Sequence, residues 1–126
     1  MRIFVVAGET SGDTHAAALL AELKSLRPEL QISGLGGPKL HAMNTDVQDW
    51  THDAAVVGLW DVLRRYGYFR QKFRATLDRI AREKPDAVLF VDYPGFNLRL
   101  AKALQPQRPN TKLLYYISPQ VWAWNR

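Results

Sequence analysis

The chain has 126 residues, of which 47% are hydrophobic and 23% are charged, and its formal net charge is +5. This composition is typical of one globular domain and excludes disordered and fibrous proteins. The sequence contains no Cys, which excludes disulfides, thiolate catalysis and zinc sites with sulfur ligands.

The chain begins with a continuous apolar run, RIFVVA at residues 2–7, which is typical of a strand buried on both faces. The run stops at Glu9, too early for a signal peptide, and no stretch approaches the ~20 apolar residues that span a bilayer. We therefore expect a soluble protein that is not exported. The turn GETSGD follows, and Ala and Leu at helical spacing then predict a helix over residues 14–26.

The same alternation of short apolar runs and helical patterns continues along the chain. Further strands are predicted at residues 31–35, 47–50, 86–91 and 112–117. Further helices are predicted at residues 39–43, 55–66, 69–83 and 97–104, with Gly67 as a break between the middle two. This order predicts an α/β fold, an open and doubly wound parallel sheet of the Rossmann-like kind, formed by residues 1–126 as one domain.

Four polar or glycine-rich segments follow the predicted strands: GETSGD, GLGGP, DYPGFN and SPQVWAW. In doubly wound sheets, ligands bind beyond the carboxyl ends of the strands. The four segments are therefore expected to converge on one edge of the sheet and to form a binding site there.

The turn GETSGD carries the first candidate residues. Gly8 and Gly12 would let the backbone approach a ligand, and free N–H groups at a helix start bind anions. Ser11, Asp13 and Thr14 are available as N-cap residues, so a capped turn without a ligand explains the segment about equally well. Glu9 is a carboxylate at a strand end, which favours binding. The segment is neither a dinucleotide fingerprint nor a P-loop.

Asp92 follows the apolar run VLFV and precedes Pro94 and Gly95, which are expected to form a sharp turn. A carboxylate that leaves a buried strand is partly desolvated, which favours a role as general base. The alternative is that Asp92 only caps the next helix. Asn97 fits either a cap or a ligand contact.

Residues 56–73 combine apolar side chains, among them Trp60, Leu63, Tyr66 and Phe69, with several Arg and Lys. Residues 64–84 hold eight Lys and Arg but only two acidic residues. This pattern fits a surface that sits in an anionic lipid interface, and equally an amphipathic helix whose apolar stripe is core. No recognisable module for nucleic-acid binding surrounds the basic residues, so no nucleic-acid partner is expected.

His15, His41 and His52 lack the spacing of helical metal ligands, and we expect no metal site. Trp122 and Trp124, two residues apart near the last residue, are expected to pack against a partner surface.

Taken in order, GETSGD, GLGGPKL, VVGLWDVL, DYPGFNLRLA and ISPQVWAW resemble the lipid-A-disaccharide synthase family over the entire chain. The resemblance implies a glycosyltransferase with two Rossmann-like domains, the GT-B architecture. It implies transfer of 2,3-diacylglucosamine from UDP-2,3-diacylglucosamine to 2,3-diacylglucosamine 1-phosphate. The products would be UDP and the β-1,6 disaccharide of lipid A, with no metal or other cofactor.

The resemblance also implies roles for residues. Asp92 matches the base that deprotonates the acceptor 6-hydroxyl. The residues expected to face the interdomain cleft and bind substrate are Gly8, Glu9, Ser11, Gly12, Asp13 and Asn97. The residues expected to meet the inner membrane from the cytoplasmic side and admit acyl chains are Trp60, Leu63, Tyr66 and Phe69.

Two departures from the family pattern stand out. Many relatives carry a second acid where this sequence has Gly95, so Asp92 would act alone. The family also has a C-terminal UDP-binding domain that this chain lacks, so residues 1–126 resemble an incomplete N-terminal, acceptor-side domain without turnover of its own. The alternative functions are a flavodoxin-like or receiver-like binding module and a non-catalytic protein that binds anionic membranes or nucleic acid.

Overall fold

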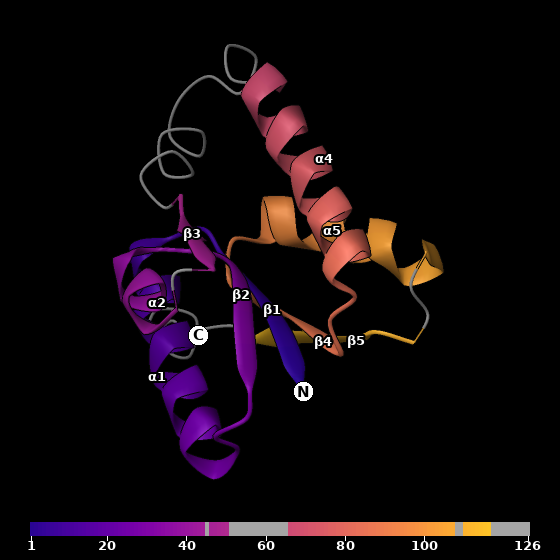
Figure 1. The fold of residues 1–126 in the computed structure, drawn as a ribbon. Helices are drawn as coiled ribbons and strands as arrows, with labels where there is room; N and C mark the ends of the chain where they lie inside the picture. The colour runs from indigo at the N-terminus through magenta and orange to yellow at the C-terminus, as the bar shows by residue number, and fades with distance from the viewer. Residues whose placement is uncertain (45, 51–65, 108–109, 117–126) are drawn as a thin grey trace, which may run out of the picture.

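A computed structural model describes residues 1–44, 46–50, 66–107 and 110–116 (Figure 1). In this part of the chain, five parallel strands form one sheet with helices on both faces. The strands are β1 (Arg2–Ala7), β2 (Gln31–Gly36), β3 (Val47–Asp49), β4 (Ala87–Val91) and β5 (Lys112–Tyr116). The helices are α1 (Thr10–Leu26), α2 (Pro38–Met43), α4 (Tyr66–Glu83) and α5 (Pro94–Gln107).

The strand order β3-β2-β1-β4-β5 confirms the predicted doubly wound sheet. The chain runs outward from β1 to β3, then crosses back and continues from β4 to β5 on the other side of β1. Helices α1 and α2 lie on one face of the sheet, and α4 and α5 lie on the other (Figure 1). The direction of winding therefore reverses between β1 and β4, the position where such sheets bind ligands.

Two hydrophobic cores, one on each face of the sheet, explain why β1 and β4 are continuous apolar runs. In β1, Ile3 and Val5 pack toward α1 and α2, whereas Phe4 and Val6 pack toward α4 and α5. All four side chains are at most 5% exposed. A strand covered on both faces has no solvent-facing positions, so the polar alternation of a half-exposed strand is missing.

Three predicted helix boundaries were wrong. Helix α1 begins at Thr10 and α5 begins at Pro94, each several residues before the predicted start. Proline suits the first position of a helix, because its missing N–H would have no partner there. Helix α4 is continuous through Gly67, although an interior glycine costs about 1 kcal/mol relative to alanine. The helix predicted at residues 55–66 otherwise lies outside the described residues.

Helix α4 buries one side and exposes the other. Phe73, Leu77 and Ile80 pack into the core that contains Phe96, so the interpretation as a core stripe is correct for Phe73. Arg74 and several other cationic side chains of the helix are exposed. No helix among the described ranges is long and apolar enough to cross a membrane. Trp60 and Leu63 lie outside the described residues, and Tyr66 and Phe69 belong to the first turn of α4.

Candidate functional site

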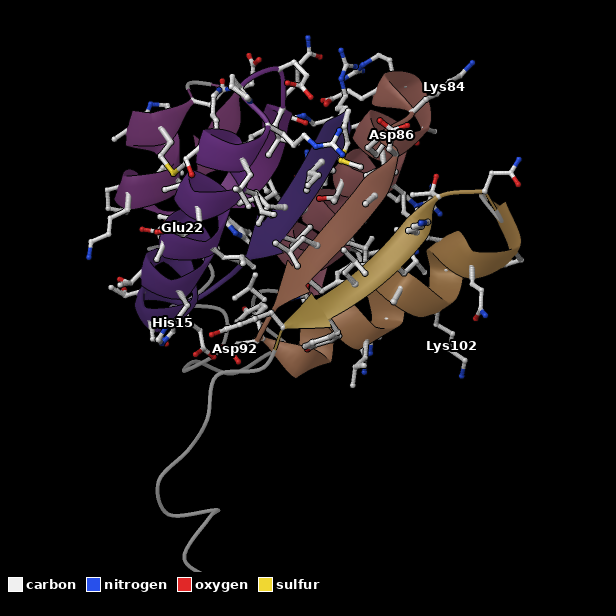
Figure 2. The ribbon with its side chains drawn as sticks, turned by 90° about the horizontal axis from the view of Figure 1, so that it is seen from below. His15, Glu22, Lys84, Asp86, Asp92 and Lys102 are labelled. Atoms are coloured by element: carbon white, nitrogen blue, oxygen red, sulfur yellow. The ribbon has the colours of Figure 1, made fainter. Side chains whose placement is uncertain are left out.

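The carboxyl ends of β1, β4 and β5 bring together residues that are far apart in the sequence. In Figure 2, Asp92 and His15 are at this edge of the sheet, whereas Lys84 and Asp86 are at the opposite edge. The start of α1 and the turn after β4 therefore meet at the position where the winding reverses. The segment from residue 117 onward, which was expected to join them, lies outside the described residues.

Asp92 and Tyr93 form an unusual turn. Their φ angles are 49° and 48°, the left-handed region that residues other than glycine rarely adopt. The N–H of Asp92 donates to the carbonyl of Tyr116 at 3.0 Å. The carbonyl of Asp92 accepts hydrogen bonds from Tyr115 Oη at 2.7 Å and from Asn97 Nδ2 at 2.8 Å. The main chain of this half-buried residue is thus held at both its donor and its acceptor.

Two carboxylates share this edge. Burial raises the pKa of Tyr115, and the negative charges of Asp92 and Glu9 raise it further. Burial likewise raises the pKa of Tyr93, with a further contribution from Glu9. The charge of Glu9 therefore raises the pKa of both tyrosines, and the charge of Asp92 raises that of Tyr115.

The glycines of the GETSGD turn have different surroundings. A Cβ on Gly8 would lie 2.6 Å from two ring carbons of Tyr93, so the absence of a side chain there makes room for Tyr93. A Cβ on Gly12 would lie 3.5 Å from Val91 Cγ1, an ordinary contact between helix and sheet. Gly8 therefore joins the ends of β1 and β4 by close packing. A Cβ on Gly95 would meet nothing within 4 Å, so this position has room for a side chain.

Asp13 is committed to a structural role. Its carboxylate, 1% exposed, accepts the backbone N–H groups of Gly37 at 2.8 Å, Lys39 at 2.9 Å and Leu40 at 3.0 Å. These are N–H groups at the start of α2, so Asp13 of α1 caps the neighbouring helix. The expectation that Ser11, Asp13 or Thr14 caps its own helix was wrong, because α1 starts at Thr10.

Glu9 is the N-cap residue of α1, but its side chain makes no capping hydrogen bond. Glu9 and Ser11 are both exposed at the candidate edge. Uncapped N–H groups at a helix start, together with an exposed carboxylate and hydroxyl, can bind an anion and sugar hydroxyls.

Asn97 lies fully buried in the first turn of α5. Its Nδ2 donates to the carbonyls of Val6, Val91 and Asp92, at 3.2, 3.4 and 2.8 Å. The side chain therefore ties the end of β1 to the end of β4.

Sequence reasoning did not identify Trp50 or His15 as part of this edge. Trp50 Nε1 donates to the carbonyl of Ala7 at 2.8 Å, and its ring packs edge-on to Tyr93 with centroids 5.9 Å apart. The ring of exposed His15 lies 6.2 Å from that of Tyr116. His15 lies six residues after Glu9, which is not a spacing at which helical side chains contact each other, so the local sequence contains no signal for it.

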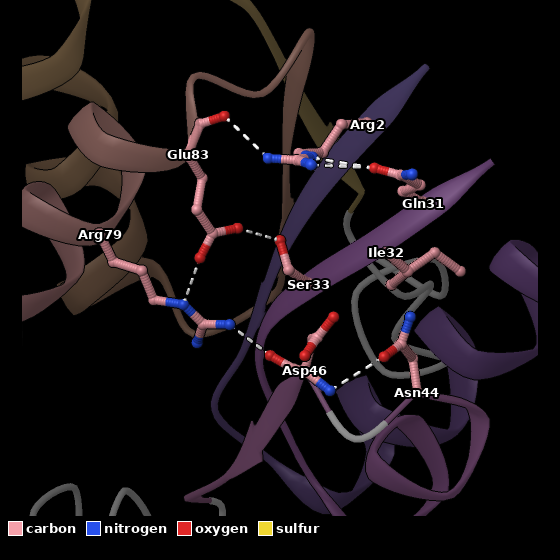
Figure 3. Close-up of a pocket in the computed structure, with 8 residues that line it drawn as sticks. All are labelled: Arg2, Gln31, Ile32, Ser33, Asn44, Asp46, Arg79 and Glu83. Atoms are coloured by element: carbon pink, nitrogen blue, oxygen red, sulfur yellow. Dashed lines mark hydrogen bonds and ion pairs between the residues drawn. The ribbon is translucent and has the colours of Figure 1, made fainter.

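A separate pocket of about 540 Å³ lies at the opposite edge of the sheet, and Figure 3 shows its lining. Glu83 accepts hydrogen bonds from Ser33 Oγ and Arg79 Nε, both at 2.6 Å. Burial raises the pKa of Glu83, but the hydrogen bonds from Ser33 and Arg79 and the charges of Arg79 and Arg2 outweigh it, so the pKa is lowered. Glu83 of α4 thus accepts a hydrogen bond from Ser33 of β2, and this contact attaches α4 to the sheet.

In the described part of the chain, no three His, Asp or Glu side chains gather in a way that could hold a metal ion. The groups that the structure brings together at the carboxyl ends of the strands are carboxylates, tyrosines and the N-terminus of α1.

The sequence matches the family model of lipid-A-disaccharide synthetase over residues 3–126. The chain belongs to this family. It is 44% identical over 123 residues to lipid-A-disaccharide synthase 1 of Legionella pneumophila (strain Lens), covering 98% of this chain and 32% of that protein. It is 43% identical over 125 residues to the synthase of Myxococcus xanthus, and the match covers 99% of this chain and 32% of that protein. It is 41% identical over 122 residues to the synthase of Coxiella burnetii (strain Dugway 5J108-111), and the match covers 97% of this chain and 32% of that protein.

The family is one of glycosyltransferases in lipid A biosynthesis, which confirms the resemblance inferred from the motifs. The chain spans about a third of the length of the curated relatives it matches.

Proposed function

We propose that this chain is the acceptor-side part of a glycosyltransferase that joins two acylated glucosamine units in lipid A biosynthesis. The donor would be UDP-2,3-diacylglucosamine and the acceptor 2,3-diacylglucosamine 1-phosphate. Family membership supports the reaction class. The single structural observation that supports the site is Asp92, a half-buried carboxylate at the reversal point of the sheet whose main chain is held by three hydrogen bonds.

In the proposed reaction, the carboxylate of Asp92 takes the proton of the acceptor 6-hydroxyl as that oxygen attacks the anomeric carbon of the donor sugar. The bond from this carbon to the UDP oxygen breaks, and UDP leaves with the electron pair. A single displacement suffices because UDP is a good leaving group, so one base and stabilisation of the departing phosphate complete the step.

The GETSGD turn would bind the polar parts of the substrates. The uncapped start of α1 suits a phosphate oxygen. Glu9 and Ser11 are exposed beside it and could accept or donate hydrogen bonds to sugar hydroxyls. Residues 1–126 span about a third of the relatives, and we expect a polypeptide limited to them to form no disaccharide.

The test compares two carboxylates in the longest natural polypeptide that contains residues 1–126. Asp92→Asn keeps the shape of the side chain and removes the base, so disaccharide formation should fall by about 10² to 10⁴-fold. Glu22→Gln, an exposed site on α1 away from this edge (Figure 2), should leave the rate unchanged. Near-parental turnover by Asp92→Asn would refute Asp92 as the base. An inactive parent polypeptide would favour a non-catalytic binding module.

We further propose that the protein associates with the anionic surface of the inner membrane from the cytoplasm. Support comes from the outer side of α4, where Arg70, Arg74 and Arg82 are exposed, with exposed Lys84 after its last turn. Each basic residue near an anionic surface contributes about 1 kcal/mol to binding.

The membrane proposal is tested by sedimentation with phosphatidylglycerol-containing vesicles. Arg74→Glu with Arg82→Glu should weaken binding about 30-fold or more, from about 2 kcal/mol lost. The matched control, Lys24→Glu with Arg27→Glu on the exposed side of α1, should bind like the parent. Equal binding by both double variants would contradict the assignment of this surface to α4.

A further inference from the structure

The side-chain amide of Asn97 is the point at which three carbonyl groups of two strands converge. Nδ2 lies 2.8 Å from the carbonyl oxygen of Asp92, 3.2 Å from that of Val6 and 3.4 Å from that of Val91. These three acceptors fix the amide orientation, because the opposite orientation would turn its oxygen toward three other oxygens. Val6 is 91 positions away in the sequence, so the contact depends on the pairing of β1 with β4.

Neither end of this amide is open to a substrate. The residue is 0% exposed, and Nδ2 is directed at main-chain oxygens. Oδ1 is also buried, and no group in the described residues donates a hydrogen bond to it. A buried acceptor without a partner costs about 1–3 kcal/mol, so the position of this side chain is retained despite an energetic penalty.

The turn that Asn97 holds is the one that carries the proposed base. Two successive residues, Asp92 and Tyr93, have positive φ angles, and each such residue costs of the order of 1–3 kcal/mol unless its surroundings hold it. The carbonyl oxygen of Asp92 accepts hydrogen bonds from both the Asn97 amide and the Tyr115 hydroxyl. Both donors therefore fix one peptide group, and this group sets the direction in which the Asp92 side chain leaves the backbone.

We propose that Asn97 is a positioning residue for the transferase reaction, acting on the Asp92 carbonyl and making no contact with substrate. The inference rests on the proposed function, since it requires Asp92 to be the base. A general base must lie within about 2.6–3.2 Å of the oxygen whose proton it takes. A displacement of about 1 Å can cost about 10²-fold in rate.

The experiment uses the longest natural polypeptide that contains residues 1–126 and measures kcat and KM for disaccharide formation. Asn97→Ala should lower kcat about 10- to 100-fold with KM within about twofold, because the substrate-facing groups remain. Tyr115→Phe removes the other donor to the same carbonyl and should also lower kcat. The two effects should be non-additive, because both variants loosen one peptide group. Ser33→Ala, which loses a partly buried hydrogen bond to Glu83 at the opposite end of the strands, is the control for stability alone.

The decisive comparison places Asn97→Ala in the Asp92→Asn background, where it should lower the residual rate no further. A further loss of the same factor there, or a raised KM with unchanged kcat, would overturn the positioning role. So would a loss that only follows the folded fraction, as in Ser33→Ala. If Asn97→Ala does not fold, Tyr115→Phe with Asp92→Asn makes the same comparison. Full activity of Asp92→Asn alone would instead refute the proposed function, so the two failures are distinguishable.

Discussion

Gly8 and Gly12 lie in the same turn, yet alanine should have opposite effects at the two positions. Neither residue has a positive φ angle, so the backbone accepts alanine at both, and only the surroundings differ. At Gly12 the new Cβ would lie 3.5 Å from Val91 and 3.7 Å from Ala7, both ordinary contact distances. At Gly8 it would lie 2.6 Å from the ring of Tyr93.

The expected magnitudes follow from these distances. Gly12→Ala replaces a helical glycine without a clash, which should raise the free energy of unfolding by about 0.5–1 kcal/mol. Gly8→Ala forces the Tyr93 ring to move, and overpacking of this kind costs about 1–3 kcal/mol. The ring has little freedom, because Tyr93 has a positive φ and packs against Trp50. The two variants should therefore differ by about 1.5–4 kcal/mol.

Urea denaturation followed by circular dichroism measures both free energies in one series. Disaccharide formation by the longest natural polypeptide that contains residues 1–126 gives a second readout, and Gly12→Ala should leave it unchanged, because the new methyl group would contact Val91 and Ala7. A Gly8→Ala variant as stable as the parent would refute the packing of Tyr93 over Gly8.

Three further predictions concern titratable groups. The pKa of Glu83 is lower in the folded protein than its ordinary 4.5, so its contribution is present above that pH and is lost as the pH falls through the folded value. Glu83→Gln should thus lower the free energy of unfolding by about 1–3 kcal/mol at pH 7, and urea titrations should show the difference shrinking toward pH 3. Asp13→Ala leaves three N–H groups without their acceptor and should cost about 1–3 kcal/mol in thermal denaturation, with a smaller loss for Asp13→Asn. Asp92→Asn should lower the pKa of Tyr115, followed by tyrosinate absorbance against a Tyr115→Phe reference, whereas Glu22→Gln should not.

The strands and the doubly wound class of the sheet could be predicted from the sequence, because a strand buried on both faces is apolar at successive positions. The run AVLFV of β4 is apolar at every position, and all five residues are buried. Because Asp92 comes directly after this run, the general rule that ligands bind at the carboxyl ends of such strands places Asp92 at the candidate site. Helix starts were less predictable, since GETSGD offers several residues that can cap a helix.

The contacts within the site were not predictable, because they depend on which strands lie side by side. The Asp13 carboxylate caps a helix that begins 25 positions later, not its own. The sequence around Asn97 is compatible with a local helix cap. Its hydrogen bond to the carbonyl of Val6 forms only because β1 lies beside β4. Trp50, after a three-residue strand, reaches the same edge through a hydrogen bond to Ala7. In each case the local sequence permits several partners, and the tertiary fold selects one.

The carboxylates of Asp13 and Glu83 hold helices in place, which argues against either of them as the base. Asp13 and Glu83 accept hydrogen bonds from main-chain or side-chain donors that hold helices in place, so neither carboxylate can take a proton from substrate without loss of those bonds. At Asp92, hydrogen bonds to the N–H and the carbonyl hold the main chain at the carboxyl ends of the strands. Residues other than glycine in the left-handed region raise the conformational energy of the turn, and a loop without such residues would end the strand at a lower energy. The proposed role of Asp92 explains this turn, because the turn and its hydrogen bonds set the direction in which the Asp92 carboxylate leaves the backbone.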